Sequence, residues 1–493
     1  MSQDTLLDVL IVGAGLSGIG AAHHLQRRCP AKRYAILEAR GSSGGTWDLF
    51  RYPGVRSDSD MYTLAYPFRP WRGGRAIVDG PAILDYLRAT AAEAGIDRRI
   101  LYEHRVLAAA WSSEAACWTL TVQAGAETQT WRTRFLHLCS GYYSYAEGHR
   151  PRFAGEEDYR GRIVEPQFWP GDLDLAGRRI VVVGSGATAV TLVPALAQQG
   201  AAQVTMLQRS PSYVVDRPSV DGIAVGLARW LPARTAHGLA RWKNLLVNRF
   251  YYRLARSRPE LFRQRLAAMA AEALGSRQLA DEHFSPRYAP WDQRVCVAPD
   301  GDLFHAIRAG RAEVVTDTIE RFTPSGLRLA GGRELAADIV VLATGLKLNV
   351  LGDIALSVDG RPFEPHRALS YKGMMLSGLP NLVATFGYTN ASWTLKADLT
   401  ASYVCRLLRH MDRRGHAVAV PREDPDVPRR PFLDLSSGYV QRAAALLPQQ
   451  GAARPWQVHQ DYLADLRSVR WSRLEDGVLQ FSSPLSEPSG KAP

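Results

Sequence analysis

The chain has 493 residues, more than one hydrophobic core usually supports, so two or three domains are expected. Hydrophobic residues make up 46% and charged residues 22%, which excludes a fibrous or largely disordered chain. The five cysteines are widely spaced and form no CxxC motif, so we predict neither a disulfide framework nor a metal site. No secretion signal and no apolar run of about 18 residues is evident, which favours a cytoplasmic protein.

The net charge of +12 could indicate a partner such as nucleic acid or a membrane surface. Its distribution along the chain is uneven, because residues 229–277 contain eleven basic side chains and only two acidic ones. Since one segment holds most of the excess, a basic surface all around the molecule is not required. We therefore predict no nucleic-acid partner.

The first segment predicts a strand, a glycine turn, a helix and a second strand. Apolar residues at 8–12 and 34–37 form the strands, and the turn between them has the GxGxxG glycines Gly13, Gly15 and Gly18. Such glycines permit a tight bend and the close approach of a pyrophosphate to the helix N-terminus. Glu38 ends the second strand, where a carboxylate can accept both ribose hydroxyls. The pattern predicts a dinucleotide site, with a purely structural turn as the alternative.

A second unit of the same kind follows an insertion. Alternating residues between about 106 and 138 predict an antiparallel meander. A strand at 180–183 then leads into a turn that contains Gly184, Gly186 and Thr188. After the next strand, at 204–207, Arg209 stands near where the first unit has its carboxylate. Because arginine pairs well with phosphate, this site should prefer NADP(H), unless Arg209 is merely a solvated surface residue.

The basic segment predicts an amphipathic helical insertion. Apolar residues recur in it at helical spacing, with arginines between them: Leu239, Trp242, Leu246, Phe250 and Leu254. The favoured interpretation is a solvated helix that packs this stripe against the core. The alternative is peripheral contact with a membrane surface, or an entry route for a lipophilic substrate.

Two nucleotide sites of opposite character imply hydride transfer from a nicotinamide, as NADPH, to a second redox cofactor, for which FAD is the economical choice. A disulfide reductase would need paired cysteines beside the flavin, and this sequence has none. Molecular oxygen is the remaining common acceptor.

Six further stretches stand along nearly the whole length of the chain: GGTW at 44–47, RYPGVRSDSD at 51–60, GSGATA at 184–189, WDQR at 291–294, ATG at 343–345 and GYTNASWT at 387–394. In their order and spacing the chain resembles the class B flavoprotein monooxygenases, and within them the Baeyer–Villiger branch typified by the ethionamide-activating enzyme.

The resemblance implies an α/β fold with two Rossmann-like dinucleotide-binding domains. The FAD domain would comprise residues 1–148 and 336–493, with the meander in its first part and a disordered tail beyond Ser482. The NADPH domain would span residues 149–335 and contain the helical insertion at about 216–290.

The resemblance assigns Arg294 to the position of the family's catalytic arginine and Asp58 to that of its carboxylate neighbour. A fixed guanidinium would stabilise the anionic C4a-peroxyflavin and the oxyanion formed on a carbonyl substrate, and Asp58 could orient Arg294. An ordinary salt bridge is the alternative. The predicted cofactor-binding residues are Gly13, Gly15, Gly18, Glu38, Thr46, Trp47, Asp58, Gly184, Gly186, Thr188, Arg209, Thr344, Gly345 and Thr394.

The implied reaction uses NADPH, FAD and molecular oxygen to oxygenate a small lipophilic organic substrate. A ketone would give an ester or lactone, whereas a protonated peroxide would favour sulfides or amines, and the sequence leaves this choice open. Two other hypotheses remain: an uncoupled NADPH oxidase that releases hydrogen peroxide, and a noncatalytic flavoprotein that acts through a partner.

One position departs from the family fingerprint FxGxxxHxxxWP. Residues 159–170 begin with Tyr159 and place Glu165 where the fingerprint has histidine. An imidazole can donate a hydrogen bond, whereas an ionised carboxylate only accepts. We expect weaker coupling or a shifted substrate class, with Arg160 or Arg162 compensating the charge; a solvent-facing Glu165 without functional effect is the alternative.

Overall fold

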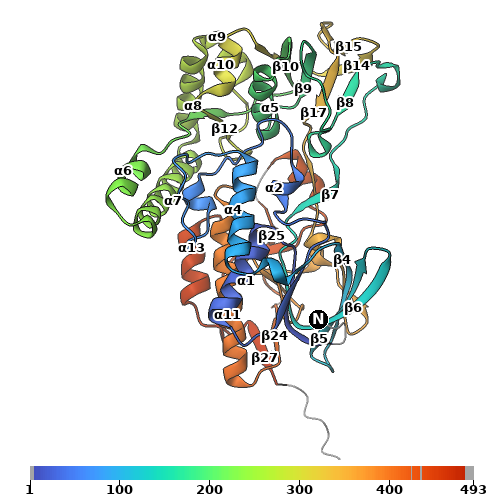
Figure 1. The fold of residues 1–493 in the computed structure, drawn as a ribbon, viewed down its shortest axis with the longest axis vertical. Coiled ribbons are helices and arrows are strands. Elements are labelled where there is room, and N and C mark those ends of the chain that lie inside the picture. The colour runs from blue at the N-terminus through green and yellow to red at the C-terminus, as the bar shows by residue number, and fades with distance from the viewer. Residues whose placement is uncertain (1–4, 424, 434–435, 484–493) are drawn as a thin grey trace, which may run out of the picture.

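The computed structural model describes residues 5–423, 425–433 and 436–483, so the tail predicted to be disordered lies almost wholly outside the described residues. Two sheets with separate cores dominate the fold (Figure 1). The larger sheet lies in the lower half of the view, the smaller one in the upper half, and helices α6 and α7 project at the left.

The larger sheet combines a parallel nucleotide-binding core with a meander. Its parallel strands are β1 (Leu7–Val12), β2 (Tyr34–Leu37), β3 (Ile100–Leu101) and β23 (Leu382–Ala384), joined through β6 (Glu127–Leu138). The first part of β6 pairs instead with β5 (Cys117–Ala124), which pairs with β4 (His104–Ser112), both in antiparallel fashion. Helices α1 (Leu16–Arg28), α4 (Gly80–Glu93) and α11 (Trp393–Arg414) pack on this sheet. The predicted strand–turn–helix–strand unit and meander are present.

The smaller sheet is parallel throughout, in the order β13-β10-β9-β17-β8. Its strands are β8 (Arg162–Val164), β9 (Arg179–Val183), β10 (Gln203–Gln208), β13 (Ala312–Thr316) and β17 (Ile339–Leu342), with α5 (Ala187–Gln198) and α10 (Asp302–Arg308) beside them. The boundary predicted at residue 336 would place β17 with the FAD domain, whereas β17 pairs with β9 and β8. Its apolar side chains complete the second core, so the chain returns to the larger domain only after β17.

The chain passes twice between the part built on the larger sheet and the part built on the smaller sheet, and the two crossing segments lie side by side. Strand β7 (Tyr143–Gly148) leaves the larger sheet, β18 (Leu346–Leu348) returns to it, and the two pair in antiparallel fashion. Thr344 also connects the two crossing segments, because its hydroxyl donates a hydrogen bond to the carbonyl of His149 at 2.6 Å. This paired crossing is where the chain passes between the two parts of the fold.

The insertion forms four helices: α6 (Gly222–Trp230), α7 (Ala233–Ser257), α8 (Pro259–Leu274) and α9 (Arg277–His283). The prediction that its apolar stripe packs on the core is wrong, because Leu239, Trp242, Leu246 and Phe250 are 45–61% exposed. Helix α7 packs instead through small and polar residues, among them Ala240, Arg241 and Asn244.

The buried polar contacts of α7 explain which face packs. Arg241 donates hydrogen bonds to the backbone carbonyls of Tyr62, Thr63 and Ala65, and Asn244 donates to Asp60. Without these hydrogen bonds the carbonyls would be buried without a donor, which costs free energy. Avoiding that cost favours packing of this face of α7 over burial of its apolar stripe. Within the described residues, we find no helix with the length and apolar character that crossing a membrane requires.

Candidate active site

A cavity of about 470 Å³ opens at the carboxyl end of β1 and is lined by Gly13, Gly15 and the segment that follows Glu38. Gly13 has φ +101°, and a Cβ there would lie 2.5 Å from the carbonyl oxygen of Cys139. Gly18 lies behind the turn, where a Cβ would lie 1.9 Å from the oxygen of Gly13. The α1 N-cap, Gly15, has no side-chain cap, which leaves the N-terminal N–H groups of the helix facing the cavity.

Glu38 is buried beside this turn at the position predicted for it. Its carboxylate accepts hydrogen bonds from the backbone N–H of Ala14 at 2.7 Å and of Arg40 at 3.0 Å. Burial raises its pKa, and these two backbone donors partly offset the rise. Each oxygen keeps a further lone pair that could accept a ribose hydroxyl.

The short helix α2 (Thr46–Leu49) covers one side of the cavity, and its residues Thr46 and Trp47 line it. Asp48, 2% exposed, anchors this helix: it pairs with Arg40 and Arg88, each at 2.7 Å, and accepts a hydrogen bond from Ser42 at 2.6 Å. The arginines and the hydroxyl lower the pKa of Asp48 against the effect of burial. This buried ion-pair cluster was not predicted from the sequence.

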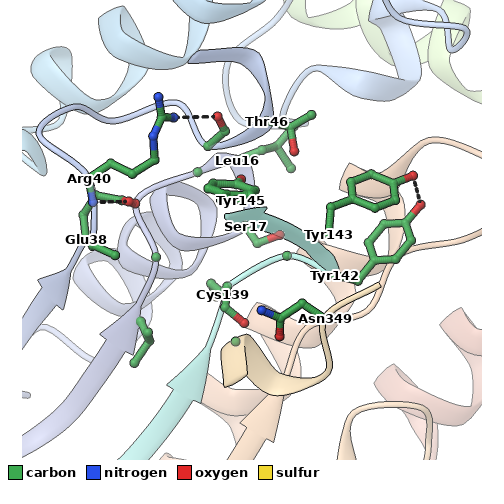
Figure 2. A pocket seen from close by; sticks show the side chains of 18 of the residues that line it. Leu16, Ser17, Glu38, Arg40, Thr46, Cys139, Tyr142, Tyr143, Tyr145 and Asn349 are labelled. Carbon is green, nitrogen blue, oxygen red and sulfur yellow. Dashed lines mark hydrogen bonds between the residues drawn. The ribbon is translucent and has the colours of Figure 1, made fainter. Parts of the chain in front are cut away.

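Aromatic residues that the sequence reasoning missed form the opposite side of the cavity. Figure 2 shows Tyr142 and Tyr143 there, with Glu38 and Arg40 across from them. Their hydroxyls are hydrogen-bonded at 2.5 Å, and Tyr142 stacks on Trp393 at 4.8 Å between ring centroids. Trp393 in turn donates to Ser17 at 2.9 Å. Their place in the sequence could have pointed to them, because Tyr142 and Tyr143 follow the carboxyl end of β6, and parallel sheets bind ligands at the carboxyl ends of their strands.

Arg294 lies beside this tyrosine pair and near Tyr439, within range of their electrostatic influence. Burial alone would lower the pKa of Arg294, but Tyr142, Tyr143, Tyr439 and Asp58 outweigh it, so its pKa lies above the ordinary value. Its Nε atom is buried and has no hydrogen-bond partner among the residues the structure describes. The guanidinium therefore stays charged and retains an unused donor.

Asp58 is near Arg294 but does not touch it. Burial raises the pKa of Asp58, while the charges of Arg294 and Arg56 lower it in part. In the described chain no ion pair joins Asp58 to Arg294, and Arg56 is paired with Asp302 at 2.5 Å. The described residues therefore show no ion pair through which Asp58 would orient Arg294, and this role of Asp58 stays a prediction.

The second glycine turn repeats the design of the first. Gly184 has φ +141°, and a Cβ there would lie 2.3 Å from the carbonyl oxygen of Ala343. Gly186 is the N-cap of α5 and has no side-chain cap, so the helix N-terminus is free. Thr188, in the first turn of α5, is hydrogen-bonded to the Tyr52 side chain. Arg209 is exposed just beyond β10 and makes no ion pair with any described residue.

The large cavity is lined by five of the predicted site residues, Gly13, Gly15, Glu38, Thr46 and Trp47, and the other predicted residues, Arg294 and Asp58 included, are not part of its lining. Thr394 is fully buried and its hydroxyl donates to the carbonyl of Leu64, which accounts for it structurally. Thr344 is engaged at the paired crossing, as described above. Gly345 instead lines a small cavity of about 20 Å³ together with Thr188 and Glu165.

Glu165 lies at this small cavity beside the paired crossing. Its carboxylate is 3.5 Å from Arg150 Nε, and its side chain is 27% exposed. The compensating arginine is therefore Arg150, and the expectation of Arg160 or Arg162 is wrong: the side chain of Arg162 pairs with Asp172 at 3.7 Å, and the backbone of Arg160 bonds to Pro324.

Comparison with known proteins agrees with this geometry. Residues 11–78 match the NAD(P)-binding Rossmann-like domain, and residues 75–351 match the flavin-binding monooxygenase-like family. The chain is 54% identical over 477 residues to the FAD-containing monooxygenase EthA of Mycobacterium tuberculosis, covering 97% of this chain and 98% of that protein. This chain belongs to the flavin-binding monooxygenase-like family. EthA of Mycolicibacterium smegmatis is 50% identical over 476 residues, covering 96% and 97% of the two chains.

Solved structures of monooxygenases share the fold of this family member. An oxidized steroid monooxygenase bound to NADP has a TM-score of 0.76 at 21% identity, covering 97% of this chain and all (100%) of that one. Cyclohexanone monooxygenase from Rhodococcus sp. Phi1 bound to NADP⁺ has a TM-score of 0.68 at 20% identity, covering 86% and 87%. The predicted family, α/β fold class and flavin monooxygenase class are confirmed.

Proposed function

We propose that this flavin monooxygenase uses FAD, NADPH and molecular oxygen to oxygenate a small lipophilic organic substrate, as a Baeyer–Villiger or heteroatom oxygenase. One observation carries the proposal: the cavity that begins at the glycine turn ends at a tyrosine pair beside Arg294, a charged guanidinium with an unused buried donor. If FAD binds along this cavity, Arg294 would supply a positive charge near the end of the flavin that faces the tyrosine pair.

The residues present suit both cofactors. Uncapped N-termini of α1 and α5 follow glycine turns in which Gly13 and Gly184 have no room for a side chain, as pyrophosphate binding requires. Glu38 would hold the ribose of FAD, and Arg209 the 2′-phosphate of NADPH. When bound, NADPH supplies a hydride and FAD supplies the chemistry that activates oxygen.

Arg294 would stabilise negative charge that develops on oxygen during the reaction, because its positive charge lies near the tyrosine pair and its buried Nε donor has no partner among the described residues. Asp58 would act through space, since its partial negative charge moderates that of Arg294 without a direct contact. Its raised pKa means that the charge of Asp58 is more easily lost than that of an exposed aspartate.

An oxygenase transfers an oxygen atom to its substrate, whereas an uncoupled NADPH oxidase releases hydrogen peroxide. The test is to supply the FAD-loaded enzyme with a panel of ketones and sulfides and to measure NADPH consumption, peroxide release and product mass together. Product that accounts for most of the NADPH supports the proposal. Peroxide equal to the NADPH consumed with every substrate would instead identify an oxidase, and no NADPH consumption would identify a noncatalytic flavoprotein.

Glu165 is proposed to weaken the coupling between NADPH use and oxygen transfer. It occupies the small cavity beside the paired crossing, where an imidazole could donate a hydrogen bond that a carboxylate cannot. We expect Glu165→His to release less peroxide for each NADPH oxidised. Glu165→Gln, which removes the charge at nearly constant size, is the matched control. An unchanged peroxide ratio and product profile in both variants would leave Glu165 without a role in coupling.

The exposed face of the insertion is proposed to contact an anionic lipid surface. Large apolar side chains crowd its helices, including Ile223 and Trp230 of α6, Leu239, Trp242, Leu246, Val247, Phe250 and Tyr251 of α7, and Leu261 of α8. Basic side chains dominate the same segment, and this combination of apolar and basic residues is typical of interfacial helices.

We expect the enzyme to sediment with phosphatidylglycerol vesicles at low salt and to be released as salt rises. Trp230→Ser with Phe250→Ser should reduce the bound fraction several-fold, since these side chains are 87% and 61% exposed. Leu107→Ser with Leu446→Ser, which removes two exposed apolar residues elsewhere, is the control. Equal binding by both double variants would contradict this contact.

A further inference from the structure

A second, strongly basic cavity lies between the end of α1, the second half of α11 and the short helix η6 (Arg467–Trp471). Its volume is about 310 Å³. Five of its nine lining residues are arginines, and none is a carboxylate: Arg28, Arg406, Arg409, Arg413 and Arg470, with Ser402, Tyr403, Cys405 and Val469. Such an accumulation of one charge around a single cavity requires an explanation.

The charge of these arginines is not compensated within the protein. None of the five forms an ion pair with another residue in the part of the chain that the structure describes. The neighbouring carboxylates of α11 are already engaged: Asp398 pairs with His24 at 2.7 Å and Asp412 with Lys32 at 2.6 Å. Because like charges repel across a cavity, this arrangement favours an anion between them.

Two of the guanidinium groups are held in place by neutral acceptors. Arg406 donates to the carbonyls of Arg470 at 2.5 Å and Ser472 at 3.0 Å, and its carbon lies 5.4 Å from the ring centre of Tyr403. Its Nε atom is buried without a partner among the described residues. Arg28 donates to the hydroxyl of Ser402 at 2.5 Å. These contacts orient the groups and leave their charges intact.

Helix dipoles explain only part of the cluster. Basic residues are favoured in the last turn of a helix, which accounts for Arg28 in α1 and Arg413 in α11. Arg406 lies well before the last turn of α11, and Arg470 belongs to a different element. Their convergence on one cavity therefore needs a further cause.

We propose that this cavity is a binding site for a phosphate group. Planar guanidinium groups pair with phosphate through two parallel hydrogen bonds, which suits a site built from arginines. Water takes about 30 Å³ per molecule, so a cavity of about 310 Å³ has room for a phosphate and an attached group. The phosphate belongs either to a free small molecule or to a lipid headgroup.

The lipid source has structural support of its own. Arg28 and Arg470 also line an adjoining cavity of about 540 Å³ that extends to Arg234 and Trp242. Trp242 belongs to the exposed apolar face of α7. A basic path therefore leads from the proposed site to the face described above as a lipid contact.

The test uses the FAD-loaded enzyme with NADP⁺ at saturation, so that both nucleotide sites are filled. Calorimetric titration with pyrophosphate at constant ionic strength measures the free-phosphate source. Sedimentation with vesicles of phosphatidylglycerol, and with vesicles of phosphatidylcholine as reference, measures the lipid source. The variant is Arg409→Gln with Arg413→Gln, both exposed on α11. The control is Arg132→Gln with Arg134→Gln on β6, which removes the same charge from a distant exposed strand.

We expect the α11 variant to lose at least about tenfold in affinity for one of the two probes, while the β6 control changes it by less than about twofold. Loss of pyrophosphate binding identifies a free phosphate ligand, and loss confined to phosphatidylglycerol vesicles identifies a lipid headgroup. Equal losses in variant and control, or no binding of either probe by the unmodified enzyme, would overturn the proposal.

Discussion

Arg294→Ala should keep its FAD and lose oxygenated product by about 100- to 1000-fold, the usual cost of removing one preorganised group that stabilises developing charge. The residue is near Tyr142 and Tyr143, which line the side of the cavity across from Glu38, and Glu38 would hold the opposite end of FAD. Flavin absorbance of the purified variant measures cofactor retention, and product mass per NADPH measures the loss.

Two further variants make this result specific. Arg287→Ala removes an exposed arginine nearby in the sequence and should leave product formation unchanged. Arg294→Lys keeps a positive charge but lacks the planar fork of donors, so an intermediate yield is expected. A normal product yield in Arg294→Ala would remove this residue from the reaction, and loss of FAD in that variant would assign it to cofactor binding instead.

Arg209→Ala should raise KM for NADPH by about 10- to 100-fold and leave KM for NADH nearly unchanged, because one charge-assisted contact is worth about 1.5–3 kcal/mol. Arg209 is exposed at the carboxyl end of β10, next to the uncapped N-terminus of α5, and has no competing carboxylate partner among the described residues. Only NADPH carries the 2′-phosphate that this guanidinium would hold.

Arg178→Ala is the matched control, because it removes an arginine from the amino edge of the same parallel sheet. Steady-state kinetics with both nucleotides give the comparison. Equal effects of Arg209→Ala on NADPH and NADH would show that Arg209 does not contact the 2′-phosphate.

Local patterns were sufficient to predict both nucleotide-binding units. Gly13 and Gly184 adopt the positive φ that their turns require, and Glu38 lies where the end of β2 places it. The order of strand, glycine turn, helix and strand is a local pattern, so spacing along the chain was enough to predict it. The assignment of Arg294, by contrast, came from resemblance to a family.

What could not be predicted depends on contacts between distant segments. Tyr439 lies near Arg294, although the sequence between them contains strands β13 and β17 of the smaller sheet and the return crossing β18. The apolar stripe of α7 was assigned to the core by its periodicity, but Arg241 and the buried carbonyls near Tyr62 decide which face packs. Arg150, and not an arginine nearer in the sequence, pairs with Glu165, because the fold brings the segment after β7 to the segment after β8.

The most direct test of oxygenation supplies isotopically labelled oxygen gas to the FAD-loaded enzyme with NADPH and an accepted ketone or sulfide. Mass spectrometry of the product and an assay for hydrogen peroxide are run on the same reaction. We predict one labelled oxygen atom in each product molecule and a product yield close to the NADPH consumed. Unlabelled product, or labelled peroxide equal to the NADPH consumed with no product, would contradict the assignment of this chain as an oxygenase.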